Sequence, residues 1–376
     1  MKKRILFYSE SWGIGGIETL IMDIIRNIDH SKYTIDIFST WDSNSLFDSE
    51  LQKYDIHRYT VFHGYRPNLL VRQVLSIIKF RKLLNKNHYD IVHINTMNGM
   101  GFTFSAAALL EHVNIRIVHS HNANFGEGHY FAKSFAHKFG KTFLGNTANV
   151  RLATSSAAGK YLFDSKRFII LHNGIDTEKY RYNSEGRSVL RRKYQIADHT
   201  LVIGAIGRLV EQKNPLFVLE AFRELHQIIP DSALLLIGAG DLEAEIDSYI
   251  SNNSLDSSVI RIGRVSSSAQ YYSAFDLFFA ASHYEGFGIT VLEAQCNGLP
   301  VFCSTAFPQE VLITPLVNRM ELTYGPKFWA KRAISYHTNF VEHGRERKNY
   351  ADVIKREGYS IIDMIKNLEH IYERGI

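Results

Sequence analysis

Two charged side chains share one loop in the second half of the chain. Arg208 and Lys213 lie in the stretch Gly207–Asn214, which follows the apolar run Leu201–Ile206. A helix is expected from Pro215 onward, so both charges belong to one strand-to-helix loop. A guanidinium fork and a flexible ammonium suit a diphosphate, the first by its geometry and the second as a point charge. The alternative is a solvated basic loop without a ligand.

Two carboxylates flank a second loop. Glu285 and Glu293 are eight positions apart, with Gly286 and Gly288 between them. This spacing is slightly more than two helical turns, and the glycines place Glu285 at the mouth of a helix that contains Glu293. Such carboxylates can accept hydrogen bonds from the hydroxyls of a sugar, beside the amides of a helix start. The alternative is one capping and one surface glutamate.

A glycine-rich turn follows the first apolar run of the chain. Gly13, Gly15 and Gly16 come after the run Ile5–Tyr8 and before a helical pattern. Such a turn can expose backbone N–H groups to a phosphate, or it can simply be tight. The third glycine of the dinucleotide fingerprint is replaced by Glu18, so a nicotinamide dehydrogenase is disfavoured.

His119 ends another apolar run, Ile115–His119, and His121 follows two residues later. Histidines at the carboxyl end of a strand can act as acids, bases or hydrogen-bond donors, although any one of 17 histidines is more often incidental. The chain has two cysteines and no Cys/His ligand spacing, so we expect neither a disulfide framework nor a metal site.

Short apolar runs alternate with helical patterns in two series, which favours α/β domains with parallel sheets. The polar stretch 176–199 is expected to connect the series. The expected strands are Arg4–Tyr8, Thr34–Ser39, Ile91–Ile94, Ile115–His119, Leu201–Ile206, Ala233–Ile237, Val259–Ile262, Leu277–Ala280 and Pro300–Cys303. The expected helices are Glu18–Ile28, Leu69–Asn85, Pro215–Ile229, Leu242–Ser251, Ala269–Ala274 and Ile289–Asn297.

The composition is that of a globular protein. The 376 residues are 45% hydrophobic and 22% charged, with a formal net charge of +5. No apolar stretch reaches the roughly 18 residues of a membrane-spanning helix, so we expect a cytoplasmic protein. The mild positive charge tolerates an anionic ligand or membrane surface, and without a basic stripe or a recognisable module we expect no nucleic-acid partner.

Taken together, these motifs and their order resemble glycosyltransferase family 4, retaining enzymes of the GT-B fold. The resemblance spans essentially the whole chain. The segments 310–314 and 328–330 are similar to the bacterial exopolysaccharide and capsule branch. The motifs that carry the resemblance are GGIE at 15–18, HSH at 119–121, NGID at 173–176, GRLVEQKN at 207–214 and EGFGITVLE at 285–293.

The resemblance implies two Rossmann-like domains that face each other across a cleft. It places an acceptor-side domain at residues 1–172, completed by a C-terminal tail, 358–376, and a nucleotide-sugar donor domain at 173–357. It also implies a reaction without a metal or cofactor. The segment 304–310 departs from the family's glycine-rich donor loop, which leaves the identity of the sugar open.

The resemblance also implies roles for individual residues. His119 and Glu285 are the expected catalytic residues, of which His119 would bond the transferred sugar near the reacting centre, with His121 as second choice, and Glu285 would hold sugar hydroxyls. Glu293 would accept hydrogen bonds from the ribose. The remaining expected donor-binding residues are Gly15, Gly16, Glu18, Asn173, Arg208, Lys213, Phe287, Gly288 and Ile289.

The expected acceptor is a lipid-linked saccharide or an oligosaccharide. In residues 129–141, phenylalanines at 131, 135 and 139 are four residues apart, among lysines. Such a helix can lie on an anionic membrane at the inner face of the cell membrane, or it can pack its aromatic stripe on the core. Two other functions stay open, a sugar-nucleotide epimerase and a non-catalytic partner subunit of another transferase.

Overall fold

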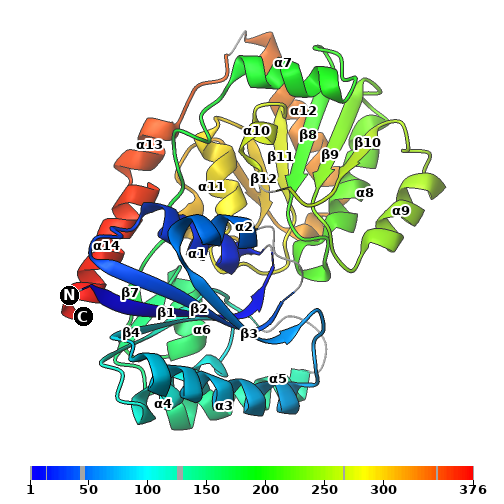
Figure 1. The fold of residues 1–376 in the computed structure, drawn as a ribbon. Helices are drawn as coiled ribbons and strands as arrows, with labels where there is room; N and C mark the ends of the chain where they lie inside the picture. Colours follow the sequence, from blue (N-terminus) through cyan, green and yellow to red (C-terminus); the bar gives the residue numbers. More distant parts are fainter. Residues whose placement is uncertain are drawn as a thin grey trace. The chain divides into compact units, whose positions relative to one another are not determined.

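The computed structural model describes residues 2–13, 15–42, 47–124, 130–265, 267–343 and 346–375, and for residues 130–133 only the backbone. The chain forms two compact units (Figure 1). The first comprises Met1–Gly174 together with Ile361–Ile376, and the second comprises Ile175–Ser360. The sequence had placed these boundaries at residues 172 and 358.

The first unit is built on a seven-stranded sheet in which every recorded pairing is parallel. A parallel sheet brings the carboxyl ends of its strands to one edge, where ligands bind in open α/β folds. In sheet order the strands are β3 (His57–His63), β2 (Tyr33–Asp42), β1 (Lys3–Trp12), β4 (Ile91–Thr96), β5 (Ile115–Ser120), β6 (Val150–Ala153) and β7 (Ile169–Ile170).

Helices cover both faces of this sheet. On β1, Ile5 and Phe7 join a core cluster with helices α1 and α14, while Leu6 and Tyr8 join a second cluster on the opposite face. This alternation is the period of two expected of a strand buried on both sides. The helical elements of the unit are α1 (Gly16–Asn27), α2 (Asp48–Leu51), η1 (Gln52–Tyr54), α3 (Leu69–Asn87), α4 (Gly101–Leu110), α5 (Tyr130–Phe139), the π-helical turn η2 (Gly140–Leu144), α6 (Ser156–Phe163) and α14 (Ile361–Arg374).

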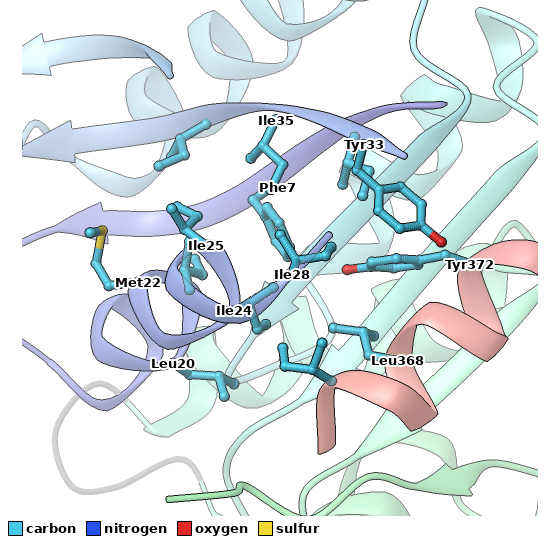
Figure 2. Close-up of a cluster of buried hydrophobic side chains, with 14 of the residues drawn as sticks. Phe7, Leu20, Met22, Ile24, Ile25, Ile28, Tyr33, Ile35, Leu368 and Tyr372 are labelled. Carbon is cyan, nitrogen blue, oxygen red and sulfur yellow. The ribbon is translucent and has the colours of Figure 1, made fainter. Parts of the chain in front are cut away.

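The C-terminal helix α14 belongs to the first unit although it follows the second in sequence. Its buried residues recur at helical spacing, so that one stripe faces the core. Figure 2 shows Leu368 and Tyr372 of α14 beside Ile28 and Tyr33, with Phe7 of β1 next to them. The rings of Tyr33 and Tyr372 meet edge to face, with their centroids 5.7 Å apart. The end of the chain is therefore part of the core of the first unit.

The second unit has a six-stranded parallel sheet, in the order β10-β9-β8-β11-β12-β13. Its strands are β8 (Leu201–Ile206), β9 (Ser232–Ile237), β10 (Val259–Ile262), β11 (Leu277–Ala280), β12 (Val301–Ser304) and β13 (Val317–Met320). Its helical elements are α7 (Ser184–Lys193), η3 (Glu211–Lys213), α8 (Pro215–His226), α9 (Glu243–Asn252), α10 (Ala269–Tyr272), α11 (Ile289–Cys296), η4 (Gln309–Val311), η5 (Leu322–Tyr324), α12 (Pro326–Glu342) and α13 (Ala351–Arg356).

The predicted α/β class with two parallel sheets is confirmed. The stretch 176–199, which the sequence predicts as the connector, contains helix α7. This helix begins at the Asn183 cap, whose side chain accepts a hydrogen bond from the Gly186 amide. Its Arg191 is buried and pairs with Asp276 at 2.6 Å. The buried guanidinium of Arg191 therefore has a structural role in the second unit.

Candidate functional site

The loop with Arg208 and Lys213 is held in place by its neighbours in the second unit. Asn214 adopts a left-handed conformation at the end of η3, and Pro215 opens α8 directly after it. Gly238, which follows β9, lies against this loop, and a Cβ atom there would stand 1.8 Å from the carbonyl oxygen of Gly207. Its φ of +141° also favours glycine. The two strand-to-helix loops thus pack backbone against backbone.

Lys213 and Glu285 meet. The Lys213 Nζ atom lies 2.5 Å from Oε1 of Glu285, which also accepts a 2.7 Å hydrogen bond from the Ser282 hydroxyl. Glu285 is buried, with 6% of its surface exposed, and a buried carboxylate needs such partners. Both predicted residues therefore lie at one place, although the chain separates them by 72 positions.

Gln212 links the loop of Lys213 to the loop of Glu285 by hydrogen bonds to backbone groups. Its side-chain amide donates to the main-chain carbonyl of Tyr284 at 3.1 Å, and its main-chain carbonyl accepts from the backbone amide of His283 at 2.9 Å. The Gln212 side-chain oxygen also accepts a 2.9 Å bond from the guanidinium of Arg208. Arg208 is exposed, so its fork is held near the loop and still meets solvent.

A hollow opens between these loops and the start of α11. It is small, with about 30 Å³ in which the centre of a water molecule fits. The first turn of a helix leaves N–H groups without partners inside the helix and carries partial positive charge, so an anion is favoured there. The polar part of the lining comes from both loops and the helix start, namely Arg208, Lys213, Ser282 and Thr290.

The turn before α11 requires glycine. Gly288 is the N-cap of α11 with φ +91°, and a Cβ there would lie 2.3 Å from the ring of Phe307. The side chain of Phe287 is buried and stacks on Tyr359, with the ring centroids 6.0 Å apart. Ile289 is the first residue of α11. The donor contacts expected of Phe287, Gly288 and Ile289 would therefore come from their backbone N–H groups at the start of α11.

Glu293 lies in the second turn of α11 and is buried. Its Oε2 atom accepts a hydrogen bond from the hydroxyl of Tyr272 at 2.5 Å. Burial, and then the negative charge of Glu293, raise the pKa of Tyr272 well above its usual range, so its hydroxyl stays protonated and donates. Tyr272 thus fixes one carboxylate oxygen of Glu293.

In the first unit, Gly15 and Gly16 lie at the start of α1. Gly15 is the N-cap, and a Cβ on it would meet Oε2 of Glu18 at 2.4 Å, while a Cβ on Gly16 would meet nothing within 4 Å. The buried Glu18 accepts a 2.8 Å hydrogen bond from the Ser11 hydroxyl. A carboxylate thus stands beside the helix start, and open space lies above Gly16.

His119 is the second-last residue of β5 and lies inside a buried group of rings. The ring centroids of His119 and His121 are 4.1 Å apart, and those of His119 and His93 are 5.3 Å apart. Burial, the largest cause, lowers the pKa of His93 and His121 to about 3 and holds that of His119 well below its ordinary range. At neutral pH all three rings are therefore neutral.

Among the buried side-chain atoms of the first unit that have no hydrogen-bond partner among the described residues are Nε2 of His119 and Oδ1 of Asn173. Buried polar atoms are nearly always hydrogen-bonded, so each is a candidate contact for a ligand. Both belong to residues that the sequence had predicted as part of the site.

Several residues of these clusters were missed by the sequence interpretation. Gly238 follows the predicted strand β9 directly, and a glycine there was a readable signal. No such signal marks Ser282, Tyr272 or His93, because a single serine, tyrosine or histidine has no sequence pattern of its own. Within the described ranges, no group of three or more His, Cys, Asp or Glu side chains could hold a metal ion.

Two family models match the chain, one after the other. Residues 14–179 match "Glycosyltransferase Family 4", and residues 186–333 match "Glycosyl transferases group 1". Among curated proteins, EpsF of Bacillus subtilis, named as a glycosyltransferase, is 27% identical over 380 residues, which cover 99% of this chain and 96% of EpsF. An Escherichia coli UDP-Gal:α-D-GlcNAc-diphosphoundecaprenol α-1,3-galactosyltransferase is 27% identical over 62% of each chain.

Solved structures share the fold. Anabaena HepE in complex with UDP and glucose superposes with a TM-score of 0.80 at 18% identity, covering 98% of this chain and 99% of HepE. Sucrose-phosphate synthase from Thermosynechococcus elongatus gives a TM-score of 0.81 at 16% identity, over 99% of both chains. With the family models and the two parallel-sheet units, these similarities show that the chain belongs to the glycosyltransferases of the GT-B fold.

Proposed function

We propose that this glycosyltransferase moves a hexosyl or N-acetylhexosaminyl group from a UDP-sugar to a hydroxyl of a lipid-linked saccharide, with retention at the anomeric carbon. The pathway would be bacterial capsular or exopolysaccharide synthesis. The observation that carries the proposal is the hollow of the second unit, where Arg208, Lys213 and the start of α11 gather positive charge. A nucleoside diphosphate is the leaving group that such a site suits.

The chemistry of the hollow fits the charge that develops in the reaction. When the bond between the sugar and the diphosphate breaks, negative charge grows on the phosphate oxygens. A fixed cation and helix N–H groups stabilise this charge without moving, and removal of one such donor typically costs about 2.7–4 kcal/mol of the barrier. The leaving phosphate would then accept the proton of the attacking hydroxyl on the same face. This account requires no metal ion and no cofactor.

The names of the relatives support the choice of donor and acceptor. The HepE structure holds UDP and glucose, and the Escherichia coli relative takes UDP-galactose and a diphosphoundecaprenol-linked sugar. That relative makes an α-1,3 linkage, and an Acholeplasma laidlawii relative that is 24% identical over 79% of this chain is an α-monoglucosyldiacylglycerol synthase. The names of both relatives thus include a lipid.

The first unit carries an apolar surface that supports a lipid-linked acceptor. On α3, the exposed side chains of Leu70, Val74 and Ile78 recur every four residues, with 74%, 48% and 47% of their surface exposed. The helix has no acidic residue, and its second half presents the exposed Lys79, Lys82 and Lys86. An apolar stripe beside lysines suits the interface of an anionic membrane.

The segment that the sequence predicted for membrane contact also exposes apolar side chains. Residue 129 lies outside the described residues, and α5 followed by η2 covers 130–144. Of the predicted stripe, the Phe131 side chain lies outside the described residues, while Phe135 and Phe139 are exposed by 73% and 46% and so do not pack on the core. Phe143 of η2 is exposed by 71%. Within the described part of the chain, no helix is both long and apolar enough to cross a bilayer. The proposed contact is therefore peripheral, at the inner face of the cell membrane.

The test is a transfer assay with a panel of radiolabelled UDP-, GDP-, ADP- and CDP-sugars and extracted bacterial lipid-linked saccharides. Of the four classes of donor, we expect only a UDP-sugar to transfer its label to the lipid fraction. NMR should show that the new glycosidic bond has the α configuration. An altered sugar nucleotide formed without an acceptor would identify an epimerase. Neither product with any donor, under conditions where a related transferase is active, would favour a non-catalytic partner subunit.

A further inference from the structure

Three buried side chains of the first unit form a hydrogen-bonded row that ends at His119. The Tyr372 hydroxyl of α14 lies 2.7 Å from Nδ1 of His93 on β4, and Nε2 of His93 lies 3.2 Å from Nδ1 of His119 on β5. At most 1% of the surface of each residue is exposed. Tyr372 and His93 are 279 positions apart in the chain. The ring of His93 thus connects helix α14 to His119.

The direction of donation along the row follows from the hydroxyl. Among the described residues, His93 is the only hydrogen-bond partner of the Tyr372 hydroxyl. If Tyr372 accepted from His93, its own hydrogen would be buried without an acceptor, which folded proteins avoid. Tyr372 therefore donates to Nδ1 of His93.

The position of the hydrogen on each ring follows. A neutral imidazole carries one N–H, and burial keeps the pKa of both histidines far below neutrality. With Nδ1 of His93 accepting, its hydrogen is on Nε2 and is donated to Nδ1 of His119. The hydrogen of His119 is then on its own Nε2, the buried atom that has no partner among the described residues.

The neighbouring His121 is committed elsewhere. The Asn95 amide nitrogen donates to the carbonyl of Tyr8 at 3.2 Å, so its Oδ1 is the atom that faces Nε2 of His121, at 2.9 Å. His121 therefore donates its hydrogen to Asn95. Of the two histidines that the HSH motif offers, His119 alone keeps an N–H for a ligand.

We propose that Tyr372 and His93 are positioning residues that lock His119 as an Nε2–H donor, so that it binds an oxygen acceptor of the ligand. The nature of that ligand, a hydroxyl or phosphate oxygen of the sugar nucleotide, rests on the proposed function. The tautomer does not, because it is a property of the free protein. Helix α14 thus has a role in the site beyond closing the core.

The test is two-bond ¹H–¹⁵N NMR of the full chain labelled with ¹⁵N-histidine, with signals assigned by His93→Gln and His119→Asn. In the free wild type we expect both His93 and His119 as neutral Nε2–H tautomers. Tyr372→Phe should release His93, so that both rings show mixed tautomers. The matched control is Tyr33→Phe, which removes a hydroxyl from the ring packed against Tyr372 and leaves the row intact.

Kinetics give the second readout. Tyr372→Phe should lower kcat/KM for the donor about 10-fold, while Tyr33→Phe should leave it within about 2-fold. His93→Gln, whose amide can donate to Nδ1 of His119, should retain more activity than His93→Leu. An Nδ1–H tautomer of His119 in the wild type, or unchanged tautomers in Tyr372→Phe, would overturn the proposal. Correct tautomers in a protein that transfers no sugar would refute the proposed function alone. If Tyr372→Phe does not fold, the wild-type spectrum and the Gln and Leu variants still decide.

Discussion

Lys213 and Glu285 form a short ion pair, with Nζ 2.5 Å from Oε1, across two strand-to-helix loops of the second unit. The pair joins the residue expected to bind the diphosphate to the residue expected to hold the sugar. A diphosphate entering the hollow would compete with Glu285 for the ammonium. We expect donor binding to loosen this pair and to free an oxygen of Glu285 for sugar hydroxyls.

Replacement of Lys213 by alanine tests the role of this ammonium. We expect Lys213→Ala to lower kcat about 10²–10³-fold, the usual effect of losing one preorganised charge donor. The free energy of unfolding should fall by about 1–3 kcal/mol, because the buried carboxylate of Glu285 loses its ion pair and keeps the hydrogen bond from Ser282. The control is Lys327→Ala, an exposed lysine at the start of α12. Steady-state kinetics that are equal for both variants would exclude the diphosphate role.

Gly16 offers a test that separates folding from binding. A Cβ at this position meets nothing within 4 Å, so Gly16→Ala should leave the melting temperature unchanged or slightly higher. If a donor phosphate approaches the backbone here, the methyl group obstructs it, and KM for the donor should rise at least about 10-fold. Gly263→Ala is the control, since its added Cβ is equally uncrowded and Gly263 does not line the hollow. Matching KM values in the two variants would remove Gly16 from the donor site.

The buried histidines make stability depend on pH. Above pH 6.5, their ordinary pKa, both the folded and the unfolded chain hold them neutral. Below it, the unfolded chain takes up protons that the folded chain refuses, so the free energy of unfolding falls as the pH falls toward about 3, where His93 and His121 titrate. Each histidine contributes up to about 1.4 kcal/mol per pH unit.

Urea unfolding at several pH values between 7 and 4.5 measures this effect. His93→Gln removes one titrating group, and the slope of unfolding free energy against pH should become shallower by about 1.4 kcal/mol per unit below pH 6. Identical slopes for the wild type and His93→Gln would show that His93 is not held neutral.

The apolar stripe of α3 predicts membrane binding that substitution can abolish. We expect the wild type to sediment with vesicles rich in phosphatidylglycerol at low salt, and the triple variant Leu70→Gln, Val74→Gln, Ile78→Gln to remain in the supernatant. The matched control replaces three exposed apolar residues of the second unit, Val189, Ile228 and Val341, by glutamine. Equal sedimentation of both triple variants would place the membrane contact elsewhere.

Much of the fold was readable because it depends on local patterns. Three strands of the second unit, β8, β10 and β11, have the predicted bounds, since buried parallel strands are short apolar runs between turn residues. Strand β1 extends to Trp12, beyond the predicted Tyr8, because pairing with β2 continues through polar residues. Strands such as β13, with Asn318 and Arg319 in it, have no apolar run to recognise.

Only the site residues that belong to sequence motifs could be predicted. Lys213 and Glu285 stood out by residue type and by their place after a strand, and the fold brings them together. Tyr272 beside Glu293 and Tyr372 beside His93 could not be predicted, because a partner distant in the sequence becomes visible only once the packing is known.

The most direct test of the proposed donor site is the thermal stability of the wild type, Lys213→Ala and Lys327→Ala with UDP-, GDP-, ADP- and CDP-sugars. A donor at about 100 times its Kd stabilises the folded state by about 2.7 kcal/mol, a shift of several degrees. We predict a shift with a UDP-sugar in the wild type and in Lys327→Ala, and none in Lys213→Ala. An equal shift in all three proteins, or no shift with any nucleotide, would contradict the assignment of the donor to this hollow.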